Sequence, residues 1–216
     1  MADALKLDAV TKQYGQDAPV IRALSHTFAP GTVTVLAGPN GSGKTTLLRL
    51  LSVVAYPSDG TVRFGDLDIH AEPYRYLERV GLVHAEAMLP EHLTGVELLQ
   101  WVAEARGVGT AGMARAHELL DALGLDDRRE KRIGTYSSGM TKKVQVAAAF
   151  VADPAIVLMD EPFRSLDAAS TRATVELLRT FRARGGIALV ATHRTDVVAP
   201  LTDATLTMGA EAASAS

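Results

Sequence analysis

The sequence predicts an α/β fold in which a block of helices interrupts a series of buried strands. Short apolar runs rich in β-branched residues, typical of buried parallel strands, occur at 32–37, 155–159 and 187–192. Helical apolar spacing follows the first run at 47–51 and separates the other two at 167–183. The 216 residues, 47% of them hydrophobic, are enough for one sizeable core or two small ones.

Shorter strands are expected in the first third of the chain. In chain order they lie at 4–10, 20–28, 61–64, 67–69 and 80–83. The turn Gly65-Asp66 joins the third and fourth as a short hairpin. The last of the five, an uninterrupted apolar run, is expected to be a central strand.

The character of the sequence changes after about residue 86. Three helical patterns are expected, at 95–105, 113–123 and about 138–152. A last strand is expected at 205–208, before a small-residue tail at 210–216 that is predicted to be disordered.

The glycine-rich run after the strand at 32–37 matches the phosphate-binding pattern G-x-x-x-x-G-K-[ST]. It comprises Gly38, Pro39, Asn40, Gly41, Ser42, Gly43, Lys44, Thr45 and Thr46. Glycines let the backbone wrap closely around an anion, and the N-terminus of the following helix adds partial positive charge. Lys44 is then placed to reach the terminal phosphates, and the Thr45 hydroxyl to ligate Mg²⁺. The plain alternative, a turn that binds nothing, is disfavoured by the strand and helix on either side.

Composition narrows the function classes. The net charge of −3 offers no electrostatic basis for binding nucleic acid. The absence of cysteine excludes disulfides and thiol chemistry and agrees with a reducing compartment. The N-terminus has no signal-peptide layout, and the longest apolar run, at 146–152, is closed by Asp153-Pro154. We therefore expect that the chain does not span a membrane by itself.

Two carboxylates, Asp160 and Glu161, follow the apolar run at 155–159. A buried parallel strand would carry both to its carboxyl end, where ligands bind in open α/β sheets. Asp160 suits a Mg²⁺ role, usually through water, and Glu161 suits a general base or water-orienting role. Taken alone, the pair is better explained as solvated strand-end carboxylates. The phosphate-binding loop in the same chain reverses that preference.

From about Leu5 to Met208, the motifs and their order resemble the nucleotide-binding subunit of an ATP-binding cassette (ABC) transporter. The resemblance implies a P-loop NTPase of the ABC type. Its sheet core is mixed, with an N-terminal antiparallel β subdomain and an inserted α-helical subdomain. On this basis 1–216 form a single domain, in which the helical subdomain occupies approximately 86–152. ATP and Mg²⁺ are the implied ligands.

The segment Tyr136-Ser137-Ser138-Gly139-Met140 stands where the family signature Leu-Ser-Gly-Gly-Gln belongs. Ser137 and Gly139 match, whereas Ser138 and Met140 depart from it. The resemblance implies that Ser137 and Gly139 bind the γ-phosphate of ATP held by a second subunit in a head-to-tail dimer. A serine that simply caps the helix is compatible with that role.

Three further residues match family positions. Asp167, in Ser165-Leu166-Asp167, matches the segment that crosses the dimer interface; a plain helix N-cap is an equal alternative, and one residue can serve both roles. His193 matches the switch histidine that contacts the γ-phosphate, beside Glu161. Tyr14 matches the aromatic residue on which adenine stacks, the alternative being a tyrosine packed in a turn.

Two further segments of the chain depart from the family pattern. Aligned on the following Leu93-Thr94, Ala85 stands where the family has a glutamine that touches Mg²⁺ and water. A methyl group can do neither. His84 and Glu86 flank Ala85. Either Glu86 substitutes for the glutamine, or the contact with Mg²⁺ and water is absent and hydrolysis is slow or differently coupled. The pair Phe163-Arg164 replaces the usual small or hydroxylic residues, and the sequence suggests no reason.

The resemblance implies an ATP-hydrolysing engine that dimerises on ATP and powers a separate membrane permease. Such a chain is cytoplasmic, held peripherally on the cytoplasmic face of the plasma membrane through the permease, which the family docks near 85–106. Trp101 is either an anchor there or a core residue. The form Tyr-Ser-x-Gly-Met and the short C-terminus resemble exporters with a separate permease chain. The alternatives are a non-transport ABC ATPase, which the net charge disfavours, and a regulatory module with weak hydrolysis. Ala85 and the altered signature keep the regulatory module open, whereas the intact site residues weigh against it: Lys44, Asp160, Glu161 and His193.

Overall fold

The computed structural model describes residues 3–86 and 88–209, and they form two sheets and a group of helices. The first sheet is antiparallel, with the strand order β2-β1-β4-β5. Its strands are β1 (Leu5–Lys12), β2 (Ile21–Phe28), β4 (Asp59–Phe64) and β5 (Leu67–Asp68). The short hairpin around Gly65-Asp66 is confirmed, because β4 and β5 pair directly across it.

The second sheet is parallel, with the strand order β6-β7-β8-β3-β9. Its strands are β3 (Thr32–Ala37), β6 (Val80–Val83), β7 (Ile156–Asp160), β8 (Ile187–Ala191) and β9 (Ala204–Thr207). The expectation that 80–83 is a central strand is wrong, because β6 lies at the edge of this sheet and pairs with β7 alone among the described strands. It is apolar because helix packing buries it: a Cβ at Gly81 would lie 2.0 Å from the Ala149 carbonyl oxygen.

Seven α-helices are described. They are α1 (Lys44–Leu51), α2 (Pro73–Leu77), α3 (Gly95–Ala105), α4 (Gly109–Ala122), α5 (Ser138–Phe150), α6 (Ala168–Ala183) and α7 (Thr195–Val198). Short 3₁₀ turns occupy Ile133–Thr135 and Ala199–Leu201. Helix α4 begins four residues earlier than expected, because Gly109 and Gly112 weaken its apolar pattern. A Cβ at Gly112 would lie 2.5 Å from that of Ala103, so glycine there lets α4 approach α3 closely.

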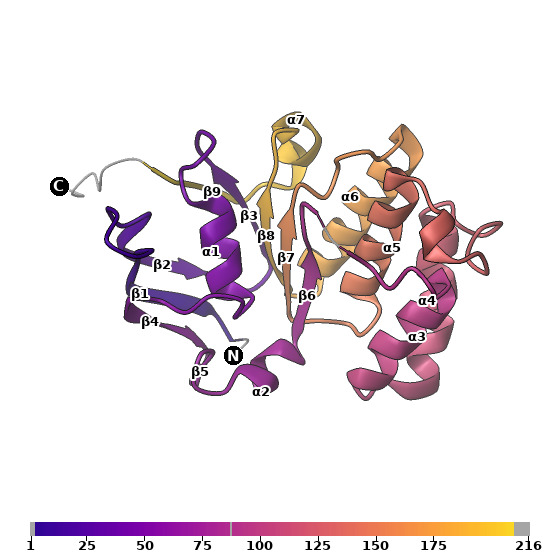
Figure 1. The fold of residues 1–216 in the computed structure, drawn as a ribbon, viewed down its shortest axis with the longest axis horizontal. Coiled ribbons are helices and arrows are strands. Elements are labelled where there is room, and N and C mark those ends of the chain that lie inside the picture. Colours follow the sequence, from indigo (N-terminus) through magenta and orange to yellow (C-terminus); the bar gives the residue numbers. More distant parts are fainter. Residues whose placement is uncertain (1–2, 87, 210–216) are drawn as a thin grey trace.

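The parallel sheet separates two apolar cores. Side chains alternate along its strands, so that Ile156 and Leu158 of β7 enter one core while Val157 and Met159 enter the other. The first core also contains α1 and the antiparallel sheet, and the second contains α3, α4 and α5. Figure 1 shows the two groups on opposite sides of β6, β7 and β8. The expected α/β architecture, with an antiparallel N-terminal sheet and a helical block, is confirmed.

The tail at 210–216 lies outside the described residues. Within 3–86 and 88–209, no helix combines the length and apolar character that crossing a bilayer requires.

Candidate functional site

The loop between β3 and α1 has the backbone that its glycines allow. Gly38, Gly41 and Gly43 have φ angles of 137°, 79° and 99°, in the region that residues with a Cβ rarely adopt. A Cβ at Gly38 would also lie 2.6 Å from the Met208 carbonyl oxygen. Pro39, Asn40 and Gly41 are exposed at the tip of the loop, whereas Ser42 and Gly43 are buried beneath it. The sequence therefore folds here into a cradle of exposed backbone at the start of α1.

Lys44 and Thr45 begin α1 and point to two different parts of this cradle. The Lys44 ammonium donates to the carbonyl oxygens of Gly38 and Pro39, at 2.7 and 2.9 Å, and so closes over the loop. The Thr45 hydroxyl donates to Asp160 Oδ2 at 3.0 Å. Thr46 is half-buried in the same first turn. The structure therefore joins the loop to the carboxylate at the end of β7, although 115 residues separate Thr45 from Asp160.

Glu161 lies directly beyond β7 in a left-handed conformation, with a φ of 49°. Its N–H donates to the Ala191 carbonyl at 2.8 Å, which fixes the residue against the end of β8. Its carboxylate accepts hydrogen bonds from the His193 N–H at 3.1 Å and from the Thr192 hydroxyl at 3.2 Å. His193 Nε2 lies 3.7 Å from Glu161 Oε1. The structure thus brings the two predicted residues together and adds Thr192, which the sequence analysis did not single out.

Ser137, Gly139 and Asp167 form a second group. The Ser137 hydroxyl caps α5 by accepting from the Met140 N–H at 3.3 Å. Gly139 packs closely, since a Cβ there would lie 2.6 Å from the Ser165 carbonyl oxygen. The start of α5 therefore lies against the segment that leads into α6.

Asp167 caps α6 and pairs with a lysine of α5. It accepts from the Ser170 N–H at 2.8 Å, and Lys143 Nζ lies 2.8 Å from its carboxylate. The Lys143 hydrogen bond, helped by the Ser170 N–H, holds the pKa of Asp167 well below its ordinary value. The N-cap alternative is thus confirmed for both Ser137 and Asp167. Within 3–86 and 88–209, no side-chain hydrogen bond or ion pair joins this group to the loop at 38–46.

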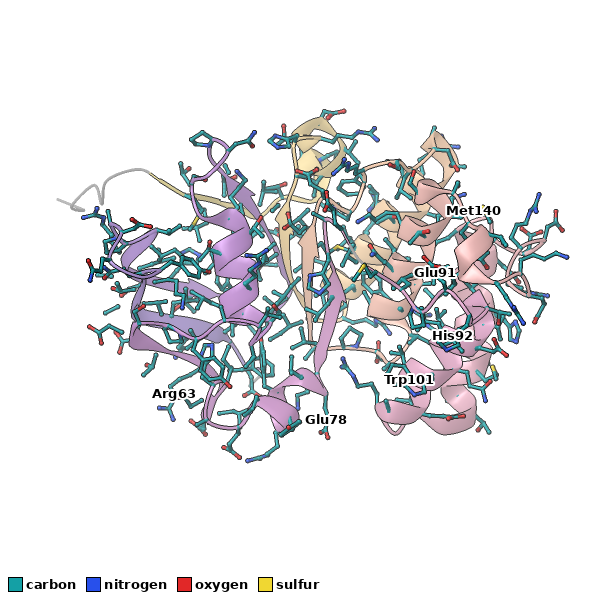
Figure 2. The ribbon with its side chains drawn as sticks, in the orientation of Figure 1. Arg63, Glu78, Glu91, His92, Trp101 and Met140 are labelled. Carbon is teal, nitrogen blue, oxygen red and sulfur yellow. The ribbon has the colours of Figure 1, made fainter. Side chains whose placement is uncertain are left out.

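Tyr14 and Trp101, for each of which the sequence left a functional and a structural interpretation open, are both exposed. Tyr14 is 43% exposed, and Lys12 Nζ lies 4.8 Å from the centre of its ring. Trp101 is 62% exposed on α3, and Figure 2 shows it on the same side of the helical block as His92 and Glu91. The alternative of a core tryptophan is therefore wrong.

The segment around Ala85 follows β6 and lies beside the Thr45–Asp160 bond. A cavity of about 350 Å³ is lined by Thr45 and Asp160 on one side and by His84, Ala85 and Glu86 on the other. Glu86 Oε1 lies 4.0 Å from Arg164 NH1, although both side chains are largely exposed. Arg164 is therefore paired with Glu86, which follows Ala85 in the chain. Phe163, next to Arg164, is buried in the core.

Lys142 of α5 also reaches this segment and was not singled out from the sequence. Its ammonium donates to the backbone carbonyls of His84 and Ala85, the latter at 3.2 Å. Nothing in the local sequence could have indicated this contact, because the partners are main-chain atoms 57 and 58 residues away.

The donor set suits a polyphosphate beside a hard divalent cation. A hydroxyl and a carboxylate 3.0 Å apart offer the oxygen ligands that such a cation prefers. The Ser42 hydroxyl is buried below the loop without a hydrogen-bond partner among the described residues. Lys44, the loop N–H groups and the start of α1 supply positive charge. The Glu161 carboxylate, held by Thr192 and His193, stands next to this position as a candidate base.

The sequence profile of the family described as ABC transporter matches residues 21–164. The daunorubicin resistance ATP-binding protein DrrA3 of Streptomyces coeruleorubidus is 33% identical over 205 residues, which cover 94% of this chain and 65% of that protein. The phosphonates import ATP-binding protein PhnC of Chromohalobacter salexigens is 33% identical over 187 residues, covering 81% of this chain and 69% of that protein. The chain spans 58–65% of the length of the first several curated relatives it matches.

Solved structures show the same arrangement of elements. One described as the structure of the ATP binding subunit of an ABC transporter superposes with a TM-score of 0.89. It is 25% identical and covers 94% of this chain and 85% of that one.

Proposed function

The chain belongs to the ABC transporter family as an ATP-binding member, and from that premise we propose that it hydrolyses ATP to drive a separate membrane permease. The observation that carries the hydrolysis proposal is the bond between Thr45 and Asp160, next to a Glu161 carboxylate held by His193. The oxygen ligands for a cation, from Thr45 and Asp160, and the candidate base Glu161 thus lie next to the phosphate-binding loop. Phosphoryl transfer depends mainly on such positioning and on electrostatic stabilisation.

In this proposal each residue of the first group has a role. The N–H groups of the loop and the Lys44 ammonium hold the phosphates, and Thr45 and Asp160 hold Mg²⁺. The bound ion would neutralise charge on the phosphate oxygens. Glu161 accepts the proton of the attacking water, and the Thr192 and His193 hydrogen bonds fix the direction of its carboxylate. The exposed ring of Tyr14 offers a flat face for the adenine.

The second group is proposed to act on a nucleotide held by another subunit. Ser137, Gly139 and Asp167 lie at the start of α5 and α6, separated from α1 by the strands of the parallel sheet (Figure 1). A head-to-tail dimer, of this chain with itself or with a related one, would bring these residues to the partner's phosphates. The helical block at 86–152 would then be the subdomain that presents Ser137 and Gly139.

The permease is proposed to dock near 85–106 and to hold the chain peripherally at the cytoplasmic face of the plasma membrane. The exposed ring of Trp101 in this stretch supports the docking proposal. Relatives named for drug resistance and for phosphonate import occur at the same 33% identity. The proposal of export therefore rests on the form Tyr136-Ser137-x-Gly139-Met140.

One observation favours a second candidate, a regulatory module that hydrolyses weakly. Ala85 provides no side chain that could contact a metal ion or a water molecule, and the cavity beside Asp160 is lined there by a methyl group. The two candidates bind ATP alike and differ in turnover.

Size-exclusion chromatography with Mg-ATP and a measurement of ATP turnover distinguish the candidates. The comparison uses wild type, Glu161→Gln and, as a matched control, Glu78→Gln, whose exposed side chain lies at the end of α2 (Figure 2). We expect wild type and the control to hydrolyse ATP, and Glu161→Gln to lose about 10²- to 10⁴-fold in turnover while forming an ATP-dependent dimer. Nucleotide binding without turnover or dimer in the wild type would refute an engine built from two copies of this chain and would support either the regulatory module or an engine shared with a related subunit.

A further inference from the structure

Lys142 is a buried cation that the proposed roles do not use. Its side chain is 6% exposed, and its ammonium donates to two main-chain oxygens, those of His84 and Ala85. A buried amine is costly unless it is hydrogen-bonded, so both acceptors are needed. Burial lowers the pKa of Lys142, and the nearby carboxylates of Asp160 and Glu161 act in the opposite direction by favouring the charged form.

The two acceptors belong to the segment where the family glutamine is missing. His84 and Ala85 line the cavity that also contains Thr45 and Asp160. Because Ala85 has no polar side chain, the polar contacts of this residue run through its backbone. Lys142 supplies a hydrogen-bond donor for that backbone, and Glu86 adds a 4.0 Å ion pair to Arg164.

A second close contact joins α5 to β6. Gly81 lies against Ala149 so tightly that a Cβ would come within 2.0 Å of the Ala149 carbonyl oxygen. Lys142 and Ala149 are seven residues apart, which is about 10 Å along a helix. Helix α5 is therefore attached to β6 and to the segment after it at two separated points. It cannot turn relative to that segment without breaking one of them.

We propose that Lys142 is a positioning residue for ATP turnover: it fixes the main chain at His84 and Ala85 beside Thr45 and Asp160. Through the same contact it ties this segment to the helix that begins at Ser138, so that Ser137 and Gly139 keep their distance from it. The inference rests on the proposed hydrolysis and extends it to a residue outside the matched motifs. In this chain an ammonium bound to backbone oxygens holds the segment that lacks a glutamine side chain.

The test compares Lys142→Met, which keeps the aliphatic stem and removes the donors, with Lys142→Arg, which keeps a charged donor. Lys131→Met is the matched control, since the Lys131 side chain is exposed and makes no hydrogen bond or ion pair with the described residues. Four quantities are measured: the Kd for ATP, KM, kcat, and the backbone NMR order parameters at 84–86 and at 156–160.

We expect Lys142→Met to bind ATP nearly as tightly as wild type, because the loop and Lys44 are untouched. Its kcat is expected to fall by about 10- to 100-fold, the loss that a displacement of about 1 Å near the reacting groups can cause. The order parameters should fall at 84–86 and stay unchanged at 156–160, and Lys142→Arg should recover part of the kcat. A generally loosened fold would instead lower the order parameters in both stretches.

Equal kcat in Lys142→Met and Lys131→Met would overturn the proposal, as would unchanged order parameters at 84–86. If wild type binds ATP without turning it over, the proposed hydrolysis by this chain alone fails, and the order parameters decide whether Lys142 holds the segment. Should Lys142→Met not fold, Lys142→Gln in the same comparison retains a shorter donor and must still lower the order parameters at 84–86.

Discussion

Replacing Gly81 with alanine sets two effects of opposite sign against each other. Glycine within a strand costs about 0.5–1 kcal/mol relative to alanine, so local preference predicts that Gly81→Ala stabilises the fold. The structure predicts the reverse, because the added Cβ would lie 2.0 Å from the Ala149 carbonyl oxygen. An ordinary contact of this kind is about 3.3 Å long, so β6 and α5 would have to separate by about 1.3 Å.

The packing cost decides whether Gly81→Ala stabilises or destabilises the fold. Overfilling a packed interior typically costs about 1–3 kcal/mol, and an overlap with backbone atoms falls at the upper end of that range because no side chain can turn aside. Subtracting the local gain leaves a net loss of about 2 kcal/mol. In a chain of this length that corresponds to a fall in Tm of about 4–8 °C.

Thermal and urea unfolding, followed by circular dichroism, measure this loss. Gly95→Ala is the matched control, because the nearest atom to its added Cβ is the Tyr136 hydroxyl oxygen at 3.1 Å, at the end of a side chain. We expect the control to unfold close to wild type. A Tm for Gly81→Ala equal to or above that of wild type would refute the close packing of β6 on α5, and with it one of the two attachments of α5.

Three further outcomes are expected. The depressed pKa of Asp167, caused first by Lys143, means that its pairing stabilises the fold above the ordinary value of 3.8 and stops doing so as the pH falls through the folded value. The difference in urea midpoint between wild type and Asp167→Asn should therefore shrink on acidification from pH 6, and a constant difference would contradict the pairing. Tyr14→Ala should weaken ATP and GTP binding alike, by the roughly 1–3 kcal/mol of one stacked base, so equal Kd values in variant and wild type would exclude stacking. Because the Glu86 side chain is 90% exposed, Glu86→Ala should keep turnover within about twofold, while Ala85→Gln should raise it. A large loss in Glu86→Ala would show that this carboxylate replaces the missing amide.

The parts of the site that could be predicted are those whose chemistry is local in the chain. Glycines at positions with positive φ, a lysine, a threonine and a following helix occur within nine residues, so the loop at 38–46 could be recognised without the fold. The carboxylates at 160 and 161 could be placed because a parallel strand delivers its end to a known edge of the sheet. The helical block could be predicted from apolar spacing of period 3.6.

The parts that could not be predicted depend on contacts between distant segments. An apolar run such as 80–83 has the same sequence pattern whether strands flank it on both sides or a helix covers it at the edge of a sheet. Its edge position therefore could not be predicted. Thr192 is an ordinary β-branched residue at the end of a strand until the carboxylate of Glu161 is beside it. The Lys142 ammonium bonds only to main-chain oxygens, and because every residue has a carbonyl oxygen, no residue type in the sequence indicates such a partner.

Glu161 holds its carboxylate on a backbone that glycine adopts without strain. The left-handed φ of 49° costs a residue with a side chain about 1 kcal/mol. Glycine at this position would relieve that strain, but it would also remove the acceptor for the Thr192 hydroxyl and the His193 N–H. A laboratory screen that selects heat resistance alone would therefore select glycine only where the relief of strain exceeds the loss of these hydrogen bonds. Among the sequences of such chains, a glycine at this point would identify nucleotide binders that have given up chemistry.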